Sequence, residues 1–439
     1  MNSRIGLLFW ATLSMLQFCG PLVAQSIDSQ PGAKPADLQL VIMLSRHGVR
    51  SPLGAPGQFD KYAAAPWPKW EVAPGILTQH GYELMKIFGT WDRAKFSTEG
   101  LLAATGCSDA AHVTIIADSD QRTRESAKAL AEGMLPGCGV QTHAQAEGTF
   151  DPLFRPIEAG VVHPDTAAAV AAVAGRIGGD PRNLTEAYRS QLAVLDRVLA
   201  GCGHLPANEK RTSIFDVSAA PAPGMEGRAA SLRGPVVLSG TITENLLLEY
   251  TQGMSDADTG WGCLDGATLR TVMQLDSANW DYAWRTLAIA HPQSSNLLDH
   301  IQKSLEQSVT GKRIPGALGK PDDRLILLVG HDSNIVAVAS ALGINWVLDG
   351  RPDDTPPGGA LLFELWRSRS DGKPFVRMEY TAQTLEQMRR SETLTPANPP
   401  SEAPIFVPGC GRADMSCTWE GFSEAMRQAI VPAYVASQP

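Results

Sequence analysis

The stretch "VIMLSRHGVRSPLG", residues 41–54, decides the fold and points to the chemistry. It begins with an apolar run typical of a buried strand, and the polar segment that follows places His47 between Arg46 and Arg50. Two neighbouring cations disfavour the protonated form of an imidazole. Because arginine forks bind the oxygens of phosphates and carboxylates, the arrangement favours a strongly anionic ligand at the end of this strand.

Two later segments repeat the pattern of an apolar run followed by a polar loop. "HVTIIA" (112–117) leads into "DSDQRTRESAKALAEGML", and "RLILLV" (324–329) leads into "GHDSNIVAVASALG"; both continuations end with helical spacing. Continuous apolar strands followed by helices are typical of a sheet covered on both faces, so the expected class is α/β. Ligands of such sheets bind beyond the carboxyl ends of the strands, where the three loops should meet.

The chain of 439 residues is long enough for a large core with an inserted lobe. Between 161 and 289 the sequence is Ala- and Leu-rich with helical spacing, and strand-like runs are scarce. We therefore expect a discontinuous α/β core, residues 25–160 and 290–439, and a mainly α-helical lobe, residues 161–289.

Three shorter segments also carry structural signals. The Pro- and Gly-containing "SAAPAPGMEGRAA" (218–230) predicts a mobile connection inside the lobe. "ALLFELWR" (360–367) and "FVRMEYTAQ" (375–383) alternate like two strands that close the sheet, and "LTPANPPSEAP" (394–404) is expected to be an extended loop.

The N-terminus has the features of an export signal. Arg4 is the only charge in residues 1–24, an apolar run too short to span a membrane follows, and Ala24 ends a small-residue cleavage site. We expect residues 1–24 to be a signal peptide and the mature protein to be periplasmic or secreted, without a membrane anchor. The net charge of −9 gives no global basic field for a nucleic acid partner.

The cysteines agree with an oxidising compartment. Of the seven, Cys19 lies in the signal segment, and an even set of six remains, which predicts three disulfides. Six cysteines permit fifteen pairings and the sequence alone does not choose among them. The pairing that we favour is Cys107–Cys138, Cys202–Cys263 and Cys410–Cys417. No CxxC, HExxH or HxH motif occurs, so no metal site is expected.

The motifs "RHGVRSP" (46–52) and "GHDSN" (330–334) together resemble the signature of the histidine acid phosphatases, a branch of the phosphoglycerate mutase-like superfamily. The segments "LTQHGYEL", "ADSDQRTRESAKALAEGMLPGC", "NWVLDGRPDDTPPGGALLFELWR" and "FVPGC" extend the similarity over nearly the whole mature chain. It is greatest to the periplasmic bacterial acid phosphatase/phytases, with glucose-1-phosphatases next. The resemblance implies a three-layer α/β/α core with a mixed sheet and an inserted α-helical lobe.

The same resemblance implies roles for individual residues. His47 corresponds to the nucleophile, and Asp332 corresponds to the proton donor for the leaving alcohol. The residues that correspond to phosphate ligands are Arg46, Arg50, Arg122 and His331. Asp118 could orient an arginine or cap a turn. Glu244 matches a position on the leaving-group side of the cleft, although a single Glu on an apolar helix usually faces solvent.

The chemistry supports this assignment independently of the resemblance. Phosphoryl transfer is mostly positioning and charge neutralisation, so an enzyme without metal or cofactor needs several fixed cations around the phosphate. Asp332 can protonate the leaving group only while it is itself protonated, which predicts an acidic pH optimum.

The substrate class is less constrained than the reaction. The resemblance implies a small phosphomonoester, most often phytate, acted on by a monomer. The residues after the motif, Leu53 to Pro56, lack the basic residue that phytase pockets often carry, so a glucose-1-phosphatase or a broad sugar phosphatase stays open. A phosphomutase is a further hypothesis, which export disfavours, and so is a non-catalytic phosphate-ester-binding protein.

Overall fold

The computed structural model describes residues 35–206, 210–223 and 229–436. The predicted signal peptide, residues 1–24, lies outside the described residues. The apolar run at 41–44 lies within the first strand, β1 (Ala36–Arg46). The other strands are β2 (Val113–Ala117), β3 (Thr142–Ala144), β4 (Ala220–Pro223), β5 (Ala230–Arg233), β6 (Leu325–Gly330), β7 (Val347–Leu348), β8 (Arg351–Pro352), β9 (Ala360–Ser368), β10 (Pro374–Ala382), β11 (Ser401–Ile405) and β12 (Ser416–Thr418).

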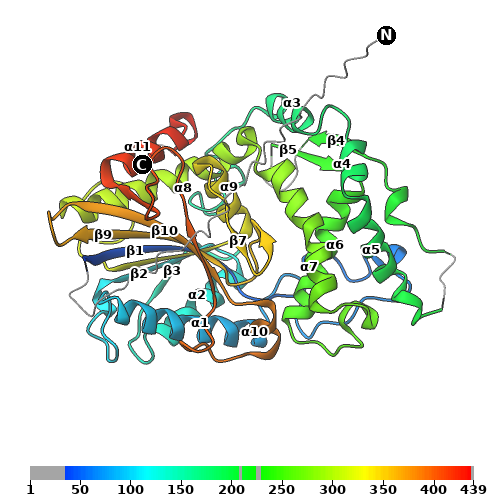
Figure 1. The fold of residues 1–439 in the computed structure, drawn as a ribbon, viewed down its shortest axis with the longest axis horizontal. Helices are drawn as coiled ribbons and strands as arrows, with labels where there is room; N and C mark the ends of the chain where they lie inside the picture. Colours follow the sequence, from blue (N-terminus) through cyan, green and yellow to red (C-terminus); the bar gives the residue numbers. More distant parts are fainter. Residues whose placement is uncertain (1–34, 207–209, 224–228, 437–439) are drawn as a thin grey trace, which may run out of the picture. The chain divides into compact units, whose positions relative to one another are not determined.

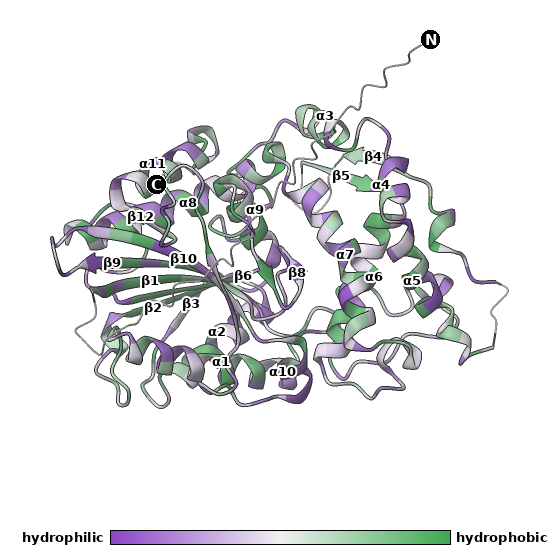
Figure 2. Ribbon diagram, in the orientation of Figure 1, coloured by the Kyte–Doolittle hydropathy of each residue, from purple (hydrophilic) through white to green (hydrophobic). Residues whose placement is uncertain are grey.

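One mixed sheet forms the centre of the protein, in the strand order β11-β10-β9-β1-β6-β2-β3, with β12 paired to β10 (Figure 1). β1, β6, β2 and β3 are parallel to one another, whereas the β1–β9, β9–β10 and β10–β11 pairs are antiparallel. Parallel strands are usually buried on both faces. All six residues of β6 are buried, and Figure 2 shows apolar residues running along the central strands.

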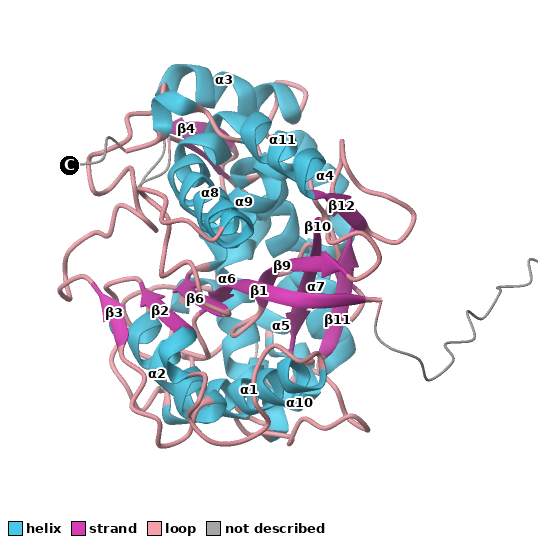
Figure 3. Cartoon of the chain, turned by 90° about the vertical axis from the view of Figure 1, so that its left-hand side faces the viewer, coloured by secondary structure: helices cyan, strands magenta, loops and turns pink. Residues whose placement is uncertain are grey.

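Helices cover both faces of this sheet. The helices are α1 (Gln79–Thr98), α2 (Gln121–Met134), α3 (Thr166–Arg176), α4 (Arg182–Ala187), α5 (Arg189–Leu199), α6 (Pro235–Thr251), α7 (Gly266–Asn279), α8 (Leu287–Thr310), α9 (Asp332–Leu342), α10 (Leu385–Arg390) and α11 (Trp419–Ala429). α1 and α2 pack on one face, and α8, α9 and α11 pack on the other (Figure 3). The expected α/β class with a mixed sheet is therefore confirmed.

The alternation of side chains along β1 explains why the sheet has two covered faces. Ile42 and Leu44 belong to the apolar cluster under α8, α9 and α11, whereas Val41 and Met43 belong to the cluster over α1 and α2. All four side chains are fully buried. Burial of apolar area on both sides is the main favourable term that holds β1 at the centre of the sheet.

A third apolar cluster lies among the helices between α3 and α7. This stretch supplies five helices, short helical turns and the β4–β5 hairpin, and none of its described residues joins the large sheet. Its content agrees with the mainly helical texture of the sequence. The chain from Ala36 onward nevertheless forms one compact unit, so the exact division at 161 and 289 stays a prediction.

Two segments contain strands that were not expected from the sequence, and residues 224–228 of the second segment lie outside the described residues. Strand β11 (Ser401–Ile405) lies at the end of the segment expected to be an extended loop, and it pairs with β10 from Met378 to Ala382. Pro404 sits at this sheet edge, where a residue without an N–H is tolerated. The described arms of the segment expected to be a mobile connection form the antiparallel hairpin β4–β5. In both cases pairing with a partner strand overrides local composition.

The disulfide prediction was correct for two pairs and wrong for the third. Cys107–Cys138 and Cys410–Cys417 are bonded, which confirms those pairings. Cys202 and Cys263 are free cysteines. The pKa of the Cys263 thiol is raised to about 12 by burial and by its hydrogen bond with Cys202. The predicted pair therefore consists of two neighbouring thiols, but these thiols are not bonded to each other.

No helix among the described residues is long and apolar enough to cross a membrane.

Burial of acidic side chains makes the stability of the fold depend on pH. Glu249 on α6 is 1% exposed, and its Oε2 accepts a hydrogen bond from the Gly260 N–H at 3.1 Å. Burial raises the pKa of Glu249 to about 8. The folded state therefore holds this proton up to about pH 8, whereas the unfolded chain releases it near pH 4. Its contribution is present in acid and is lost as the pH rises toward 8.

We predict that Glu249→Gln flattens this pH dependence. One pKa unit corresponds to roughly 1.4 kcal/mol, so between about pH 5 and pH 8 the wild type should lose a few kcal/mol more unfolding free energy than the variant. Urea denaturation at the two pH values measures this difference. Parallel losses in both proteins would show that Glu249 is not the group that titrates.

Candidate active site

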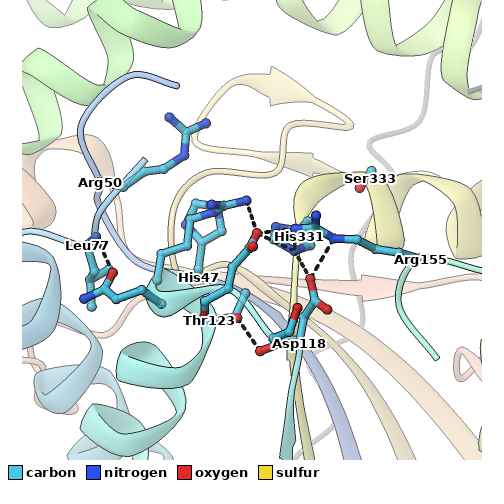
Figure 4. Close-up of polar contacts among 12 residues, drawn as sticks. His47, Arg50, Leu77, Asp118, Thr123, Arg155, His331 and Ser333 are labelled. Atoms are coloured by element: carbon cyan, nitrogen blue, oxygen red, sulfur yellow. Dashed lines mark hydrogen bonds and ion pairs between the residues drawn. The ribbon is translucent and has the colours of Figure 1, made fainter. Parts of the chain in front are cut away.

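Three neighbouring parallel strands end at the same edge of the sheet. Arg46, the last residue of β1, is paired with Gly330, the last residue of β6, and Ala117 at the end of β2 is paired with Val329. The loops that follow carry His47, His331 with Asp332, and Asp118 with Arg122. The structure therefore brings these predicted residues to one place (Figure 4).

Backbone hydrogen bonds fix the segment that carries His47. The His47 N–H donates to the Gly330 carbonyl at 3.1 Å, and the His47 carbonyl accepts from the Gly358 N–H at 3.0 Å. The Arg46 N–H donates to the Gly359 carbonyl at 2.8 Å. The loop before β9, which contains "TPPGG", thus holds the main chain on both sides of His47.

Close packing at Gly48 leaves no room for a side chain. A Cβ at Gly48 would lie 2.8 Å from Met85 Cγ and 2.9 Å from the Gly81 carbonyl, both on α1. The Gly48 N–H donates to Ser126 Oγ on α2 at 2.9 Å. The turn at Gly48 in the RHGVRSP motif therefore packs closely between α1 and α2, the two helices that cover this face of the sheet.

The environment of His47 defines its protonation state. The ring is 2% exposed, and Nδ1 lies 2.8 Å from the Gly48 carbonyl, so Nδ1 carries the hydrogen and Nε2 keeps its lone pair. Burial, followed by the charges of Arg122, Arg46 and Arg50, holds the pKa of His47 well below its ordinary value. The imidazole is therefore neutral, and Nε2 is available for a nucleophilic attack.

Arg46 and Arg50 lie beside this ring, and both are almost completely buried. Arg46 Nη1 donates to the Thr355 carbonyl at 2.5 Å, and Nη2 lies 3.0 Å from Asp332 Oδ2. Glu244 on α6 pairs with Nη2 of Arg46 and, at 3.3 Å, with Nη2 of Arg50. Glu244 thus faces the two arginines and not solvent.

His331 directly precedes α9. Its backbone N–H donates to Asn334 Oδ1 at 2.9 Å, and its ring Nε2 donates to Asp118 Oδ2 at 2.6 Å. The His331 and His47 ring centroids are 5.6 Å apart. Burial lowers the pKa of His331, with Arg122 and Arg155 acting in the same direction against Asp118.

Asp118 is fully buried at the end of β2. Burial raises the pKa of its carboxyl group, but the hydrogen bond from His331 and the charge of Arg155 outweigh burial and lower the pKa. Its backbone carbonyl also accepts a hydrogen bond from Thr123 Oγ1 at 2.7 Å. Asp118 therefore orients a histidine and an arginine, and its main chain takes part in the turn.

Asp332 occupies the first turn of α9, next to Arg46. Its Oδ1 accepts a hydrogen bond from the Ser333 N–H at 2.7 Å. Burial raises the pKa of the carboxyl group, but the charges of Arg46, His331 and Arg50 outweigh burial and lower the pKa. Asp332 is thus ionised while no anion occupies the site.

Arg155, which no sequence pattern indicated, lies in the loop between β3 and α3. Its Nε is 2.8 Å from Asp118 Oδ2, its Nη2 is 2.9 Å from His331 Nε2, and Nη2 also pairs with Asp120 Oδ2. Figure 4 shows Arg155 pointing toward His331 and Asp118. The segment "DPLFRP" carries no motif, and only the fold places it beside the other two loops.

Asp118, Asp120 and His331 offer ligand atoms within 4.8 Å of one another, which is close enough to hold a metal ion. The guanidinium of Arg155 contacts all three groups and lies where such an ion would bind. Arg122 Nη2 also pairs with Asp120 Oδ2, at 2.5 Å. The positive charge that these carboxylates require is thus supplied by side chains of the chain itself.

Comparison with known proteins gives consistent matches. The family model of the histidine phosphatase superfamily (branch 2) matches residues 37–194 and 252–381. Phytase AppA of Escherichia coli strain K12 is 34% identical over 94% of this chain and 96% of the relative. A glucose-1-phosphatase of Providencia rettgeri is 27% identical over 93% and 95%. The structure of Hafnia alvei phytase in complex with tartrate has a TM-score of 0.84 at 32% identity, covering 92% of this chain and all of that chain.

The close packing of the motif against α1 predicts a large effect of one added methyl group. A Cβ at Gly81 would lie 2.1 Å from the Val49 carbonyl, so Gly81→Ala must displace the backbone next to His47. We expect the variant to lose about 1–3 kcal/mol of stability and its affinity for inorganic phosphate to fall about tenfold or more.

Calorimetry of unfolding and of phosphate binding measures both effects. Gly175→Ala on α3 is the matched control, because its Cβ would have nothing within 4 Å. This control should bind phosphate like the wild type. A Gly81→Ala protein with unchanged phosphate affinity would show that the motif tolerates displacement.

Proposed function

This chain belongs to the histidine phosphatase superfamily (branch 2) and is a phosphoric monoester hydrolase, and from that premise we propose that it cleaves phytate at acidic pH through a phosphohistidine on His47, without a metal ion. One observation carries the proposal: a buried, neutral imidazole with a free Nε2 lies among Arg46, Arg50 and Arg122. Three fixed guanidinium groups can neutralise a phosphate dianion and direct its phosphorus toward Nε2.

In the first step, the substrate phosphate binds to the arginines and displaces their carboxylate partners. Nε2 of His47 attacks phosphorus, the bond to the ester oxygen breaks, and its electron pair stays on that oxygen. An alkoxide is a poor leaving group, so an acid must donate a proton to it. Asp332, 3.0 Å from Arg46 Nη2, is the group that we assign to this role.

The ionised state of Asp332 in the ligand-free site explains why acid is required. Its pKa is low because Arg46 and other cations face it. A bound phosphate engages those cations and adds its own negative charge, and both changes raise the pKa of Asp332. Asp332 then takes up a proton on substrate binding, and this uptake becomes easier as the pH falls.

In the second step, water attacks the phosphohistidine. Asp332, now ionised, accepts a proton from the water, the N–P bond breaks, and Nε2 recovers its lone pair as inorganic phosphate forms. On substrate binding, the Nε2–H of His331 is proposed to turn from Asp118 Oδ2, which it contacts in the ligand-free site, to a phosphate oxygen. Glu244 is proposed to line the leaving-group side, where it joins α6 to both motif arginines.

The proposed substrate rests on the phytases among the relatives and solved structures. A glucose-1-phosphatase or a broad sugar phosphatase is the second candidate. The relative from Providencia rettgeri favours it, and so does Leu53, an apolar residue that is 59% exposed directly after the motif. A non-catalytic phosphate-ester-binding protein would need neither a free Nε2 nor Asp332. We also propose that the protein is exported to the periplasm or secreted and acts as a monomer.

The proposed function predicts that the mature protein releases inorganic phosphate at about pH 5, where a carboxyl group can still be protonated. Phytate, glucose 1-phosphate and p-nitrophenyl phosphate are compared by kcat/KM. His47→Ala should abolish turnover and keep the thermal unfolding transition, and EDTA should have no effect. Faster turnover of glucose 1-phosphate would favour the second candidate, and no phosphate from any ester would contradict the proposed reaction.

Asp332→Asn should separate proton donation from phosphate binding. The amide cannot supply a proton, so kcat on phytate should fall about a hundredfold or more. With p-nitrophenyl phosphate the loss should be about tenfold smaller, because its phenolate leaves without protonation. Steady-state kinetics on both esters measures the difference. Equal losses would remove Asp332 from the acid role.

A further inference from the structure

The cation that the proposed reaction leaves without a role is Arg155. A phosphate monoester group has three terminal oxygens and carries up to two negative charges. Arg46, Arg50, Arg122 and His331 already supply enough donors for those oxygens. We infer that Arg155 binds a second phosphate group of the substrate, next to the one being cleaved, and so selects esters that carry more than one phosphate.

The position of Arg155 fits an outer binding residue. The side chains of Arg46, Arg50 and Arg122 are 2%, 6% and 13% exposed, whereas that of Arg155 is 19% exposed. The guanidinium carbon lies 5.8 Å from the ring centroid of Phe150, which is itself half exposed. Arg155 therefore stands between the buried histidines and solvent.

The hydrogen bond between His331 and Asp118 orients the His331 ring without Arg155. The backbone N–H of His331 donates to Asn334 Oδ1 at 2.9 Å, and its ring Nε2 donates to Asp118 Oδ2 at 2.6 Å. Arg155 Nη2, 2.9 Å from that protonated nitrogen, gains no second hydrogen bond there. Nη1 of Arg155 has no hydrogen-bond partner among the described residues, so both terminal nitrogens have donors left for an incoming anion.

Arg155 also reduces the repulsion that the neighbouring carboxylates would exert on an additional anion. Asp120 is shared with Arg122, and Asp118 already accepts a hydrogen bond from His331. Without Arg155, two carboxylates would face a substrate phosphate with only Arg122 to compensate them. Arg155 thus offsets their repulsion and presents a guanidinium fork, whose geometry suits a phosphate.

Arg155 also supplies a cation that the motif loop does not. Leu53, Gly54, Ala55 and Pro56 follow the motif and carry no charge. A remote phosphate of a polyphosphorylated substrate would find no partner on that loop. The arginine comes instead from the loop before α3, on the side of the site that His331 and Asp118 form.

The inference rests on the proposed function, and its test compares a substrate with several phosphates with a substrate that has one. For Arg155→Gln, we expect the ratio of kcat/KM on phytate to kcat/KM on p-nitrophenyl phosphate to fall about tenfold or more, the cost of one lost charge-assisted contact. Arg124→Gln on α2 is the matched control. It removes the same charge, and the Arg124 side chain donates to the Gln145 carbonyl rather than into the site. The control should keep the wild-type ratio.

Two outcomes would overturn the inference. If Arg155→Gln lowers kcat/KM equally on both esters, Arg155 only positions His331 and Asp118. If it changes neither, Arg155 has no part in substrate binding. Should Arg155→Gln fail to fold, Arg155→Lys, which keeps the charge but not the planar fork, decides by the same ratio: a fall of about two- to fivefold supports the inference, and an unchanged ratio overturns it.

A binding measurement keeps this test separate from the reaction. Competition calorimetry with myo-inositol hexakissulfate and with inorganic phosphate needs no turnover. The hexakissulfate should lose about tenfold more affinity than phosphate in Arg155→Gln, and equal losses would again overturn the inference. Wild-type protein that binds both anions but releases no phosphate from any ester would contradict the proposed function while leaving the role of Arg155 supported.

Discussion

The structure depends on keeping several arginine side chains buried beside an imidazole that must stay neutral. Removing a cation from water is costly unless a counter-charge and hydrogen bonds replace the lost solvent. Arg46 is 2% exposed and meets this requirement with Glu244, Asp332 and the Thr355 carbonyl. Burial and the same cations lower the pKa of His47, so a single cluster offers donors to an anion and keeps the imidazole neutral.

This requirement explains why elements far apart in the sequence converge on the end of β1. Glu244 comes from α6, Asp332 from α9, and the Thr355 carbonyl from the loop before β9. None of these groups could be supplied by the sheet edge alone, because the strand ends carry the arginines and histidines themselves. The helical segment therefore does more than cover the site: it contributes the carboxylate that pairs with both motif arginines.

Much of this arrangement could be predicted from the sequence. Continuous apolar runs at 41–44, 112–117 and 324–329 identify parallel strands, and parallel strands place their following loops together. The same reasoning could not find Arg155, because its loop follows only the short edge strand β3. The contact of Arg155 with Asp118 and His331 depends on the path of the 21-residue loop between Ala144 and Thr166. It also could not tell that Glu244 faces Arg46 rather than solvent, because apolar residues lie on nearly every side of α6.

The thiols of Cys202 and Cys263 show a further limit of the sequence. The fold brings the two thiols close together, but a disulfide also requires a specific geometry.

The balance of charge in the site has a consequence for how it can bind an anion. Four arginines (Arg46, Arg50, Arg122 and Arg155) face four carboxylates (Asp118, Asp120, Glu244 and Asp332), each in at least one ion pair. A phosphate dianion therefore enters a site whose cations are already compensated, and it must displace or protonate carboxylates to bind. Displacement requires the carboxylate side chains to turn away from their arginines, whereas protonation requires only acid. Because protonating one carboxylate removes one competing charge, low pH should favour anion binding as well as the proposed protonation of the leaving group, and both would depend on the same buried arginines.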